Sequence, residues 1–136
     1  MEVAGVELVS VLVAAAASFL FGSLYYFTLA RPWREAVGKS EEEIAIAMSA
    51  RTFIVAALAQ LVMAFMLAGV LMHIGIGSIR AGMLSATFLW FGFVLTTMTV
   101  NHGFQGARRS LTLIDGGHWL GVLLIQGAIL GWWGEG

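Results

Sequence analysis

Long runs of apolar residues separated by short polar segments dominate the pattern of the chain. A helix that crosses the roughly 30 Å hydrocarbon core of a bilayer needs about 20 apolar residues. Four runs meet this requirement, and none carries Asp, Glu, Lys or Arg well inside its limits. The pattern therefore predicts an all-α integral membrane four-helix bundle, forming one domain over residues 1–136. The predicted spans are residues 6–29, 52–73, 81–100 and 117–133.

Composition supports the membrane prediction and narrows the classes of partner. Hydrophobic residues make up 60% of the chain and charged residues 11%, whereas soluble domains carry about 25% charged residues. A net charge of −1 argues against a nucleic-acid partner, because binding phosphates needs a basic surface. Cysteine is absent, which removes disulfides and thiol chemistry. We expect the lipid bilayer as the surroundings, and nothing in the sequence indicates a cofactor.

The first apolar run differs from a secretory signal peptide. It is too long for a signal h-region, and Glu2 and Glu7 occupy the place of the basic n-region. We therefore expect a retained span.

Basic residues in the short loops predict the orientation. Cytoplasmic loops carry an excess of Lys and Arg. The side that holds both termini has only Arg80, so loops one and three are expected in the cytoplasm and both termini outside. The basic residues of loops one and three are Arg31, Arg34, Lys39, Arg51, Arg108 and Arg109.

The first loop contains helix signals of its own. Pro32 suits a first helical turn, so residues 32–37 predict a short interfacial helix that ends at Gly38. Ser40 and Glu43 fit a capping box, which predicts that the second helix starts near residue 41 and continues into the bilayer. The glutamate run is alternatively an interaction patch for a soluble partner.

The loop before the last apolar run carries Asp115, where a helix N-cap is expected. Its carboxylate could accept hydrogen bonds from the backbone N–H groups of Gly117 or His118.

Small residues at four-residue spacing predict close helix contacts, because packing in a bilayer relies on small side chains. These faces exceed what one compact monomer obviously requires, so we expect a homo-oligomer, with a dimer as the first hypothesis. The faces are Ala14–Ser18–Gly22, Ala56–Ala64–Ala68 beside Gln60, and the pairs Gly117–Gly121 and Gly127–Gly131.

Four neutral polar side chains are predicted at membrane depth. Counting along the helices places Gln60 and Gln126 about 12 Å from the cytoplasmic ends. Ser18 lies at a similar level and Thr96 a little shallower. They predict either a hydrogen-bonded layer or the lining of a narrow polar path. Trp90 lies inside the third span, where its indole N–H requires a partner.

Polar and aromatic residues also gather at the expected cytoplasmic ends of three spans. Two histidines and an aspartate there could hold a divalent metal, although their spacing matches no metal motif. A proton relay, a small-ligand pocket, and interfacial caps with an aromatic belt are the other interpretations. No GxSxG elbow is present, and we assign neither catalytic nor metal-ligating residues. The cluster comprises Tyr25, Tyr26, Asn101, His102, Gln105, Asp115 and His118.

The first and third spans share a similar pattern. When Phe21-Gly22 is aligned with Phe91-Gly92, Lys39-Ser40 falls on Arg109-Ser110. This is consistent with a duplicated helical hairpin, related by an axis along the membrane normal.

Several of these motifs together resemble a known family. The stretches "FGSLYYFTLARPWREAVG", "WFGFV" and "VNHGFQGARRSLTLIDGGHWLGVLLIQGAILGWW" are similar to the bacterial membrane proteins grouped as domain of unknown function 1761. The positions that match its pattern are Gly22, Tyr25, Tyr26, Trp33 and Gly38, whereas His118 stands where an aromatic residue is expected. The resemblance implies a four-span protein of the bacterial inner membrane and carries no activity.

Three hypotheses for the function remain open. The first is a homo-oligomeric structural or accessory subunit without enzymatic chemistry, associated with a larger membrane protein. The second is a conduit for a small solute, using the level of Gln60 and Gln126 with a mouth at Tyr26 and His102. The third is a lipid- or quinone-handling membrane enzyme.

Overall fold

The computed structural model describes residues 1–75 and 77–135, and it is almost entirely helical. Four continuous helical segments are long and apolar enough to cross a membrane: Leu8–Thr28, Ala50–Ile74, Ile79–Gln105 and Arg109–Glu135. The predicted all-α, four-helix membrane fold is therefore confirmed. The elements are β1 (Glu2–Val3), β2 (Val6–Glu7), α1 (Leu8–Thr28), α2 (Ala30–Val37), α3 (Glu41–Ala47), α4 (Ala50–Ile74), α5 (Ile79–Leu89), the π-helix η1 (Trp90–Leu95), α6 (Thr96–Gln105) and α7 (Arg109–Glu135).

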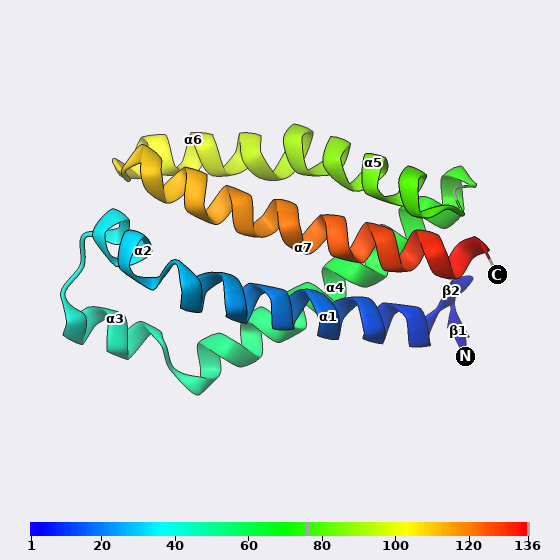
Figure 1. Cartoon of the computed structure of the whole chain (residues 1–136), viewed down its shortest axis with the longest axis horizontal. Coiled ribbons are helices and arrows are strands. Elements are labelled where there is room, and N and C mark those ends of the chain that lie inside the picture. Colours follow the sequence, from blue (N-terminus) through cyan, green and yellow to red (C-terminus); the bar gives the residue numbers. More distant parts are fainter. Residues whose placement is uncertain (76, 136) are drawn as a thin grey trace.

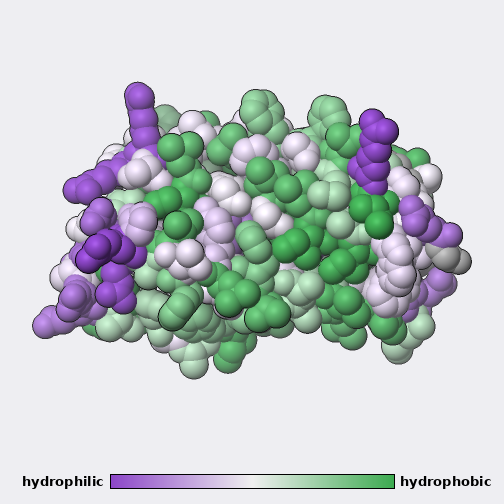
Figure 2. All heavy atoms as spheres, viewed as in Figure 1, coloured by the Kyte–Doolittle hydropathy of each residue, from purple (hydrophilic) through white to green (hydrophobic). Residues whose placement is uncertain are grey.

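The helices run antiparallel, so the chain has two distinct ends (Figure 1). Both termini and the α4–α5 turn lie at one end, which we call the terminal end. Helices α2 and α3 and the α6–α7 turn lie at the other, which we call the loop end. Figure 2 shows hydrophilic side chains at both ends and mainly hydrophobic ones between them, as expected for a bundle with an apolar middle.

Helix α7 is the central element of the bundle. It packs against α5 on one side and α1 on the other, while α4 packs mainly against α1 (Figure 1). The contact with α5 brings two backbones together: a Cβ added to Gly82 would meet the carbonyl of Gly127, and one added to Gly131 would meet the carbonyl of Ser78. Only glycine permits such an approach.

The small-residue faces are therefore in use within a single chain. Ala14 and Ser18 of α1 and Ala64 of α4 have no exposed surface. On α7, Gly127 and Gly131 pack against α5, while Gly121 faces Phe21 of α1. The faces from which we expected a homo-oligomer thus pack against other helices of the same chain, and self-association stays a prediction.

The polar stretch between the third and fourth spans forms more helix than predicted. The third span continues to Gln105, and α7 begins at Arg109, after a turn over residues 106–108 in which Gly106 has a φ of 69°. Both helices therefore extend beyond the predicted spans of 81–100 and 117–133 in this region. The polar residues of this stretch continue both helices, and α6 stops at Gly106, which adopts the left-handed conformation that favours glycine.

The first loop agrees with prediction at its start and differs at its end. Helix α2 stops at Gly38 in the left-handed conformation, and the capping box of Ser40 and Glu43 is present. The expected continuous helix from residue 41 into the bilayer was wrong, because α3 ends at Ala47. Ser49 then caps a new helix by accepting a hydrogen bond from the Thr52 N–H at 3.3 Å, and the chain changes direction there.

Candidate binding groove

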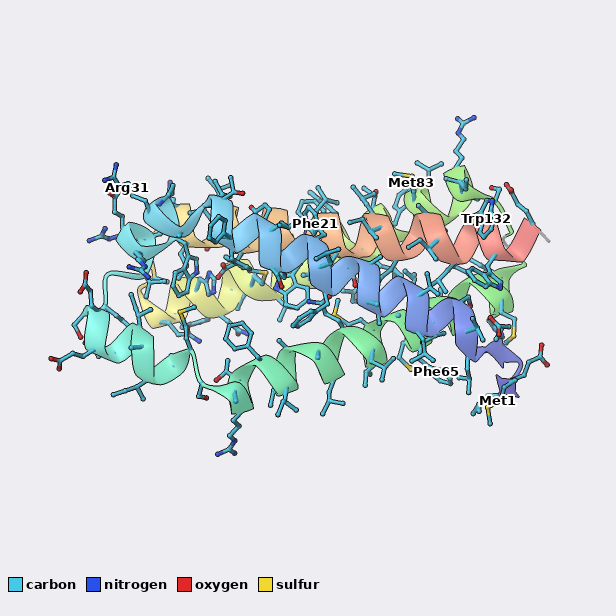
Figure 3. The ribbon with its side chains drawn as sticks, turned by 60° about the horizontal axis from the view of Figure 1, so that its bottom comes forward. Met1, Phe21, Arg31, Phe65, Met83 and Trp132 are labelled. Atoms are coloured by element: carbon cyan, nitrogen blue, oxygen red, sulfur yellow. The ribbon has the colours of Figure 1, made fainter. Side chains whose placement is uncertain are left out.

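A groove of about 570 Å³ lies between α1 and α4 at the loop end. The two helices diverge toward α3 in both ribbon views (Figures 1 and 3), and this divergence leaves the space that the groove occupies. Its walls are chiefly aromatic and aliphatic, with few polar groups. The lining residues are Phe19, Gly22, Ser23, Tyr26, Phe27, Ala30, Arg34, Met48, Phe53, Ala56, Gln60, His118 and Trp119.

Helical periodicity places the wall residues. The α1 positions follow helical spacing, because Gly22 and Ser23 lie 3 and 4 residues after Phe19, and Tyr26 and Phe27 lie one turn further along the same face. Residues at positions 53, 56 and 60 form the facing stripe on α4. Met48 lines the groove from the break between α3 and α4.

Gln60 lies at the floor of the groove with one half of its amide unused. The side chain is only 3% exposed, and its Oε1 accepts a hydrogen bond from Ser18 Oγ at 2.9 Å. Its Nε2 donates to no described residue and lies 3.7 Å from the position that a Cβ on Gly22 would take. Because Gly22 has no side chain, no Cβ stands between this donor and the groove that Gln60 lines.

His118 of α7 reaches the same floor from the other side. It is 5% exposed and sits among aromatic rings, with centroid distances of 4.7 Å to Tyr26 and 4.6 Å to Trp119. Its buried Nδ1 has no partner among the described residues, and its Nε2 lies 2.6 Å from the Cβ position of Gly22. Gln60 and His118 therefore both keep unused hydrogen-bonding capacity. Because an unpaired buried polar atom costs about 1–3 kcal/mol, a partner for these side chains would stabilise the protein.

A polar layer lies directly beside Gln60. Gln126 Nε2 donates to Ser18 Oγ at 3.0 Å and to the backbone carbonyl of Gln60 at 3.2 Å. The layer predicted from the sequence therefore forms for these three residues. Thr96 does not join it, because its hydroxyl is exposed and donates to the Gly92 carbonyl of its own helix at 2.8 Å. Gln126 does not line the groove.

Part of the predicted polar cluster at the loop end comes together around Tyr26, whose ring packs against those of Tyr25 and His118, while His102 and Asn101 lie apart from it. Asp115 lies inside α7, so its prediction as an N-cap was wrong; its Oδ1 instead accepts from the Tyr26 hydroxyl at 2.7 Å. His102 Nδ1 shares a hydrogen bond of 2.7 Å with Thr112 Oγ1. Asn101 is exposed. Within the described ranges, no three His, Cys, Asp or Glu side chains are placed to hold a metal ion.

Two further predicted residues have defined partners. Trp90 donates from Nε1 to the carbonyl of Gly116 at 2.8 Å, which confirms the expected partner inside the bundle. Tyr25 donates to the carbonyl of Ile114 at 2.6 Å. Both bonds fasten α7 to a neighbouring helix and leave Tyr26 as the tyrosine that lines the groove.

The family of the chain agrees with this architecture. The sequence profile of the family described as "Protein of unknown function (DUF1761)" matches residues 9–131. The chain belongs to this family. The match extends from the first span into the last, so the groove, its floor and the polar layer lie within the family domain. Comparisons with curated proteins and with solved structures gave no match.

Sequence reasoning identified the floor residues but not the groove. Gln60 was identified because polar groups at membrane depth are costly, and His118 was identified as part of the cluster at the expected cytoplasmic ends of the spans. The walls were missed because Phe19, Phe27 and Phe53 look like ordinary lipid-facing residues. A usable signal was present in the aromatic stripe of α1, which runs on the same face as Gly22.

Proposed function

We propose that this protein binds one amphiphilic molecule of the bilayer in the groove between α1 and α4. Hydrogen-bond acceptors of that molecule would meet Gln60 Nε2 and His118 at the floor, and its apolar part would lie along the aromatic walls. The observation that carries the proposal is that Gln60 Nε2 and His118 Nε2 meet beside Gly22, and neither forms a hydrogen bond within the described residues. His118 Nδ1 is in addition buried without a partner there.

The surroundings strengthen this interpretation. Hydrocarbon offers no water to satisfy a polar group, so unpaired groups at membrane depth require a partner from elsewhere. The volume of about 570 Å³ lies within the range of roughly 300–1,000 Å³ that is usual for ligand sites, and such sites are mostly apolar with few polar groups. A lipid-like molecule supplies both the acceptor and the apolar surface.

This proposal keeps the lipid-binding part of the third hypothesis from the sequence, a lipid- or quinone-handling membrane enzyme. It assigns no catalytic residues. The conduit hypothesis gains less support, because Ser18, Gln60 and Gln126 bond to one another rather than face a shared passage. The accessory-subunit hypothesis rested on small-residue faces that the monomer uses internally.

The basic loops supply the orientation in this proposal. With loops one and three in the cytoplasm and both termini outside, the loop end faces the cytoplasm of a bacterial cell, and the groove opens into the inner leaflet of its inner membrane. Tags fused separately to residues 1 and 136 should both react with a membrane-impermeant reagent in intact cells. Protection of either tag would reverse this assignment.

Native mass spectrometry of the full chain in mild detergent tests the binding. The wild type should retain one lipid-like molecule through purification. Gln60→Leu and His118→Phe should each weaken retention by about tenfold, the effect of roughly one lost hydrogen bond to the ligand. Gln126→Leu is the matched control, because it removes an amide from the same polar layer outside the groove.

A second readout separates binding from folding. Thermal unfolding in detergent should show the three variants within a few degrees of one another. Equal retention by wild type, Gln60→Leu and His118→Phe, all three folded, would reject the groove as the binding site.

A further inference from the structure

We infer that the groove selects a phospholipid with an anionic head group, held at its mouth by Arg34. This inference rests on the proposed binding function and names its ligand class. Arg34 is the one charged residue among those that line the groove, and no carboxylate lines it. The ammonium of a zwitterionic head group would therefore find a cation at the mouth and no counter-charge in the lining.

Helix α2 holds Arg34 in a fixed place. Arg108, from the α6–α7 turn, donates from Nη1 to the backbone carbonyl of Glu35 at 2.7 Å. That carbonyl belongs to the last turn of α2, where carbonyls lack intrahelical donors and a cation is favoured. Ala36 of the same turn is buried, with 4% exposure. The two contacts dock α2 over the loop end of the groove.

The guanidinium of Arg34 is free to take a ligand. It forms no ion pair and donates no hydrogen bond within residues 1–75 and 77–135, and the residue is exposed. Arginine presents a planar fork of donors that matches phosphate oxygens in a bidentate geometry. A cation at the groove mouth, on a short helix rich in charged residues, lies at the level where phosphates of the bilayer are found.

The positions of Arg34, Gln60 and His118 along the groove set the order in which the parts of the lipid would lie. A phosphate at Arg34 comes first, and ester carbonyls reach inward toward the donors at Gln60 and His118. The acyl chains follow the walls formed by Phe19 and Phe53 and leave between α1 and α4. Donors at both ends of the groove suit a molecule whose polar atoms are acceptors.

Competitive lipid titration tests the inference. The purified full chain is titrated with phosphatidylglycerol, phosphatidylcholine and oleic acid of matched chain length, and bound species are measured by native mass spectrometry. The wild type should prefer phosphatidylglycerol over phosphatidylcholine by about tenfold. Arg34→Gln should abolish that preference while still binding both lipids. Arg31→Gln, an exposed position on the same helix outside the lining, should keep the preference.

The outcomes separate this inference from the proposed function. Equal binding of the two phospholipids by wild type, weakened by Gln60→Leu, overturns the head-group assignment and leaves the groove intact. Binding of oleic acid in preference to either phospholipid overturns it in favour of a fatty acid. If the preference for phosphatidylglycerol survives Arg34→Gln, or if Arg31→Gln lowers it equally, the preference comes from general surface charge and the role of Arg34 is overturned. Absence of any lipid binding overturns both proposals.

Discussion

The imidazole of His118 on α7 lies directly over Gly22 on α1, with Nε2 2.6 Å from the point where a Cβ would stand. The absence of one methyl group on α1 thus gives His118 its position and leaves the floor of the groove open. The same glycine also faces Gln60 Nε2, at 3.7 Å from that point. A side chain at this one backbone position would therefore meet both Gln60 and His118.

Gly22→Ala should impair the groove without unfolding the bundle. The added methyl group collides with the end of the His118 side chain, which must rotate and fill part of the floor. We expect lipid retention to fall by about tenfold in native mass spectrometry. Gly92→Ala, at the aligned position of the third span, adds a methyl group with nothing within 4 Å and should retain lipid normally. Equal retention by the two variants would contradict the proposed floor.

Gly82→Ala should destabilise the whole bundle. Its Cβ would meet the carbonyl of Gly127, which belongs to the backbone of α7 and cannot rotate away, so α5 and α7 must separate. Overpacking of this kind costs about 1–3 kcal/mol, measurable by unfolding in mixed micelles. Gly103→Ala on the open face of α6 has no neighbour within 4 Å and serves as the control. A stability loss shared by both variants would point to a general glycine effect rather than to this contact.

Tyr26→Phe should destabilise more than Tyr25→Phe. Removing the Tyr26 hydroxyl deprives the half-buried Asp115 carboxyl of its donor at 2.7 Å, and an unsatisfied buried polar group costs about 1–3 kcal/mol. Tyr25 donates to the Ile114 carbonyl, which sits within α7 where intrahelical donors are available, so its loss should cost about 0.6 kcal/mol. Unfolding in mixed micelles compares the two. The reverse order would show that Asp115 is satisfied by another group.

Glu7 should make stability depend on pH. Its pKa lies below the usual value because its carboxylate accepts backbone hydrogen bonds from Ser10 and Val9, at 2.7 and 3.0 Å. A lowered folded-state pKa means that this stabilisation is complete above the ordinary pKa of 4.5 and is lost as the pH falls through the folded value.

The measurement is the thermal midpoint of wild type and Glu7→Ala between pH 7 and pH 3. Their difference should be largest near pH 7 and should shrink below pH 4.5. Glu2→Ala provides the control, since Glu2 pairs opposite Glu7 in the hairpin and makes no hydrogen bond to the helix end within the described chain. If the difference in thermal midpoint between wild type and Glu7→Ala does not change with pH, the Glu7 carboxylate is not its cause.

The sequence predicted the parts of the fold that follow from the bilayer as solvent. Runs of about 20 apolar residues can satisfy the backbone in hydrocarbon only as helices, so four spans were identified and the polar layer around Gln60 was expected. Helix ends were predicted poorly where the apolar pattern stops before the helix does. Asp115 was misassigned as a cap for this reason, because nothing in the apolar pattern shows that α7 begins at Arg109.

The groove could not be predicted because it depends on how helices diverge. The position of Met48 depends on a break at Ser49, where a capping serine competes successfully with helix continuation. The pairing of Gly22 with His118 joins residues from the first and last spans. Such pairings are set by three-dimensional packing, whereas periodicity describes each helix alone.

The glycine contact between α5 and α7 has a mechanical consequence. Two backbones in van der Waals contact cannot slide without first moving apart, so α5 and α7 behave as one rigid unit, and Tyr25 ties α1 to it. Helix α4 has few contacts with α5 and meets the rest chiefly through α1. Exchange of a bound molecule would therefore proceed by an outward tilt of α4 alone, pivoting near the terminal end where β2 packs against α4.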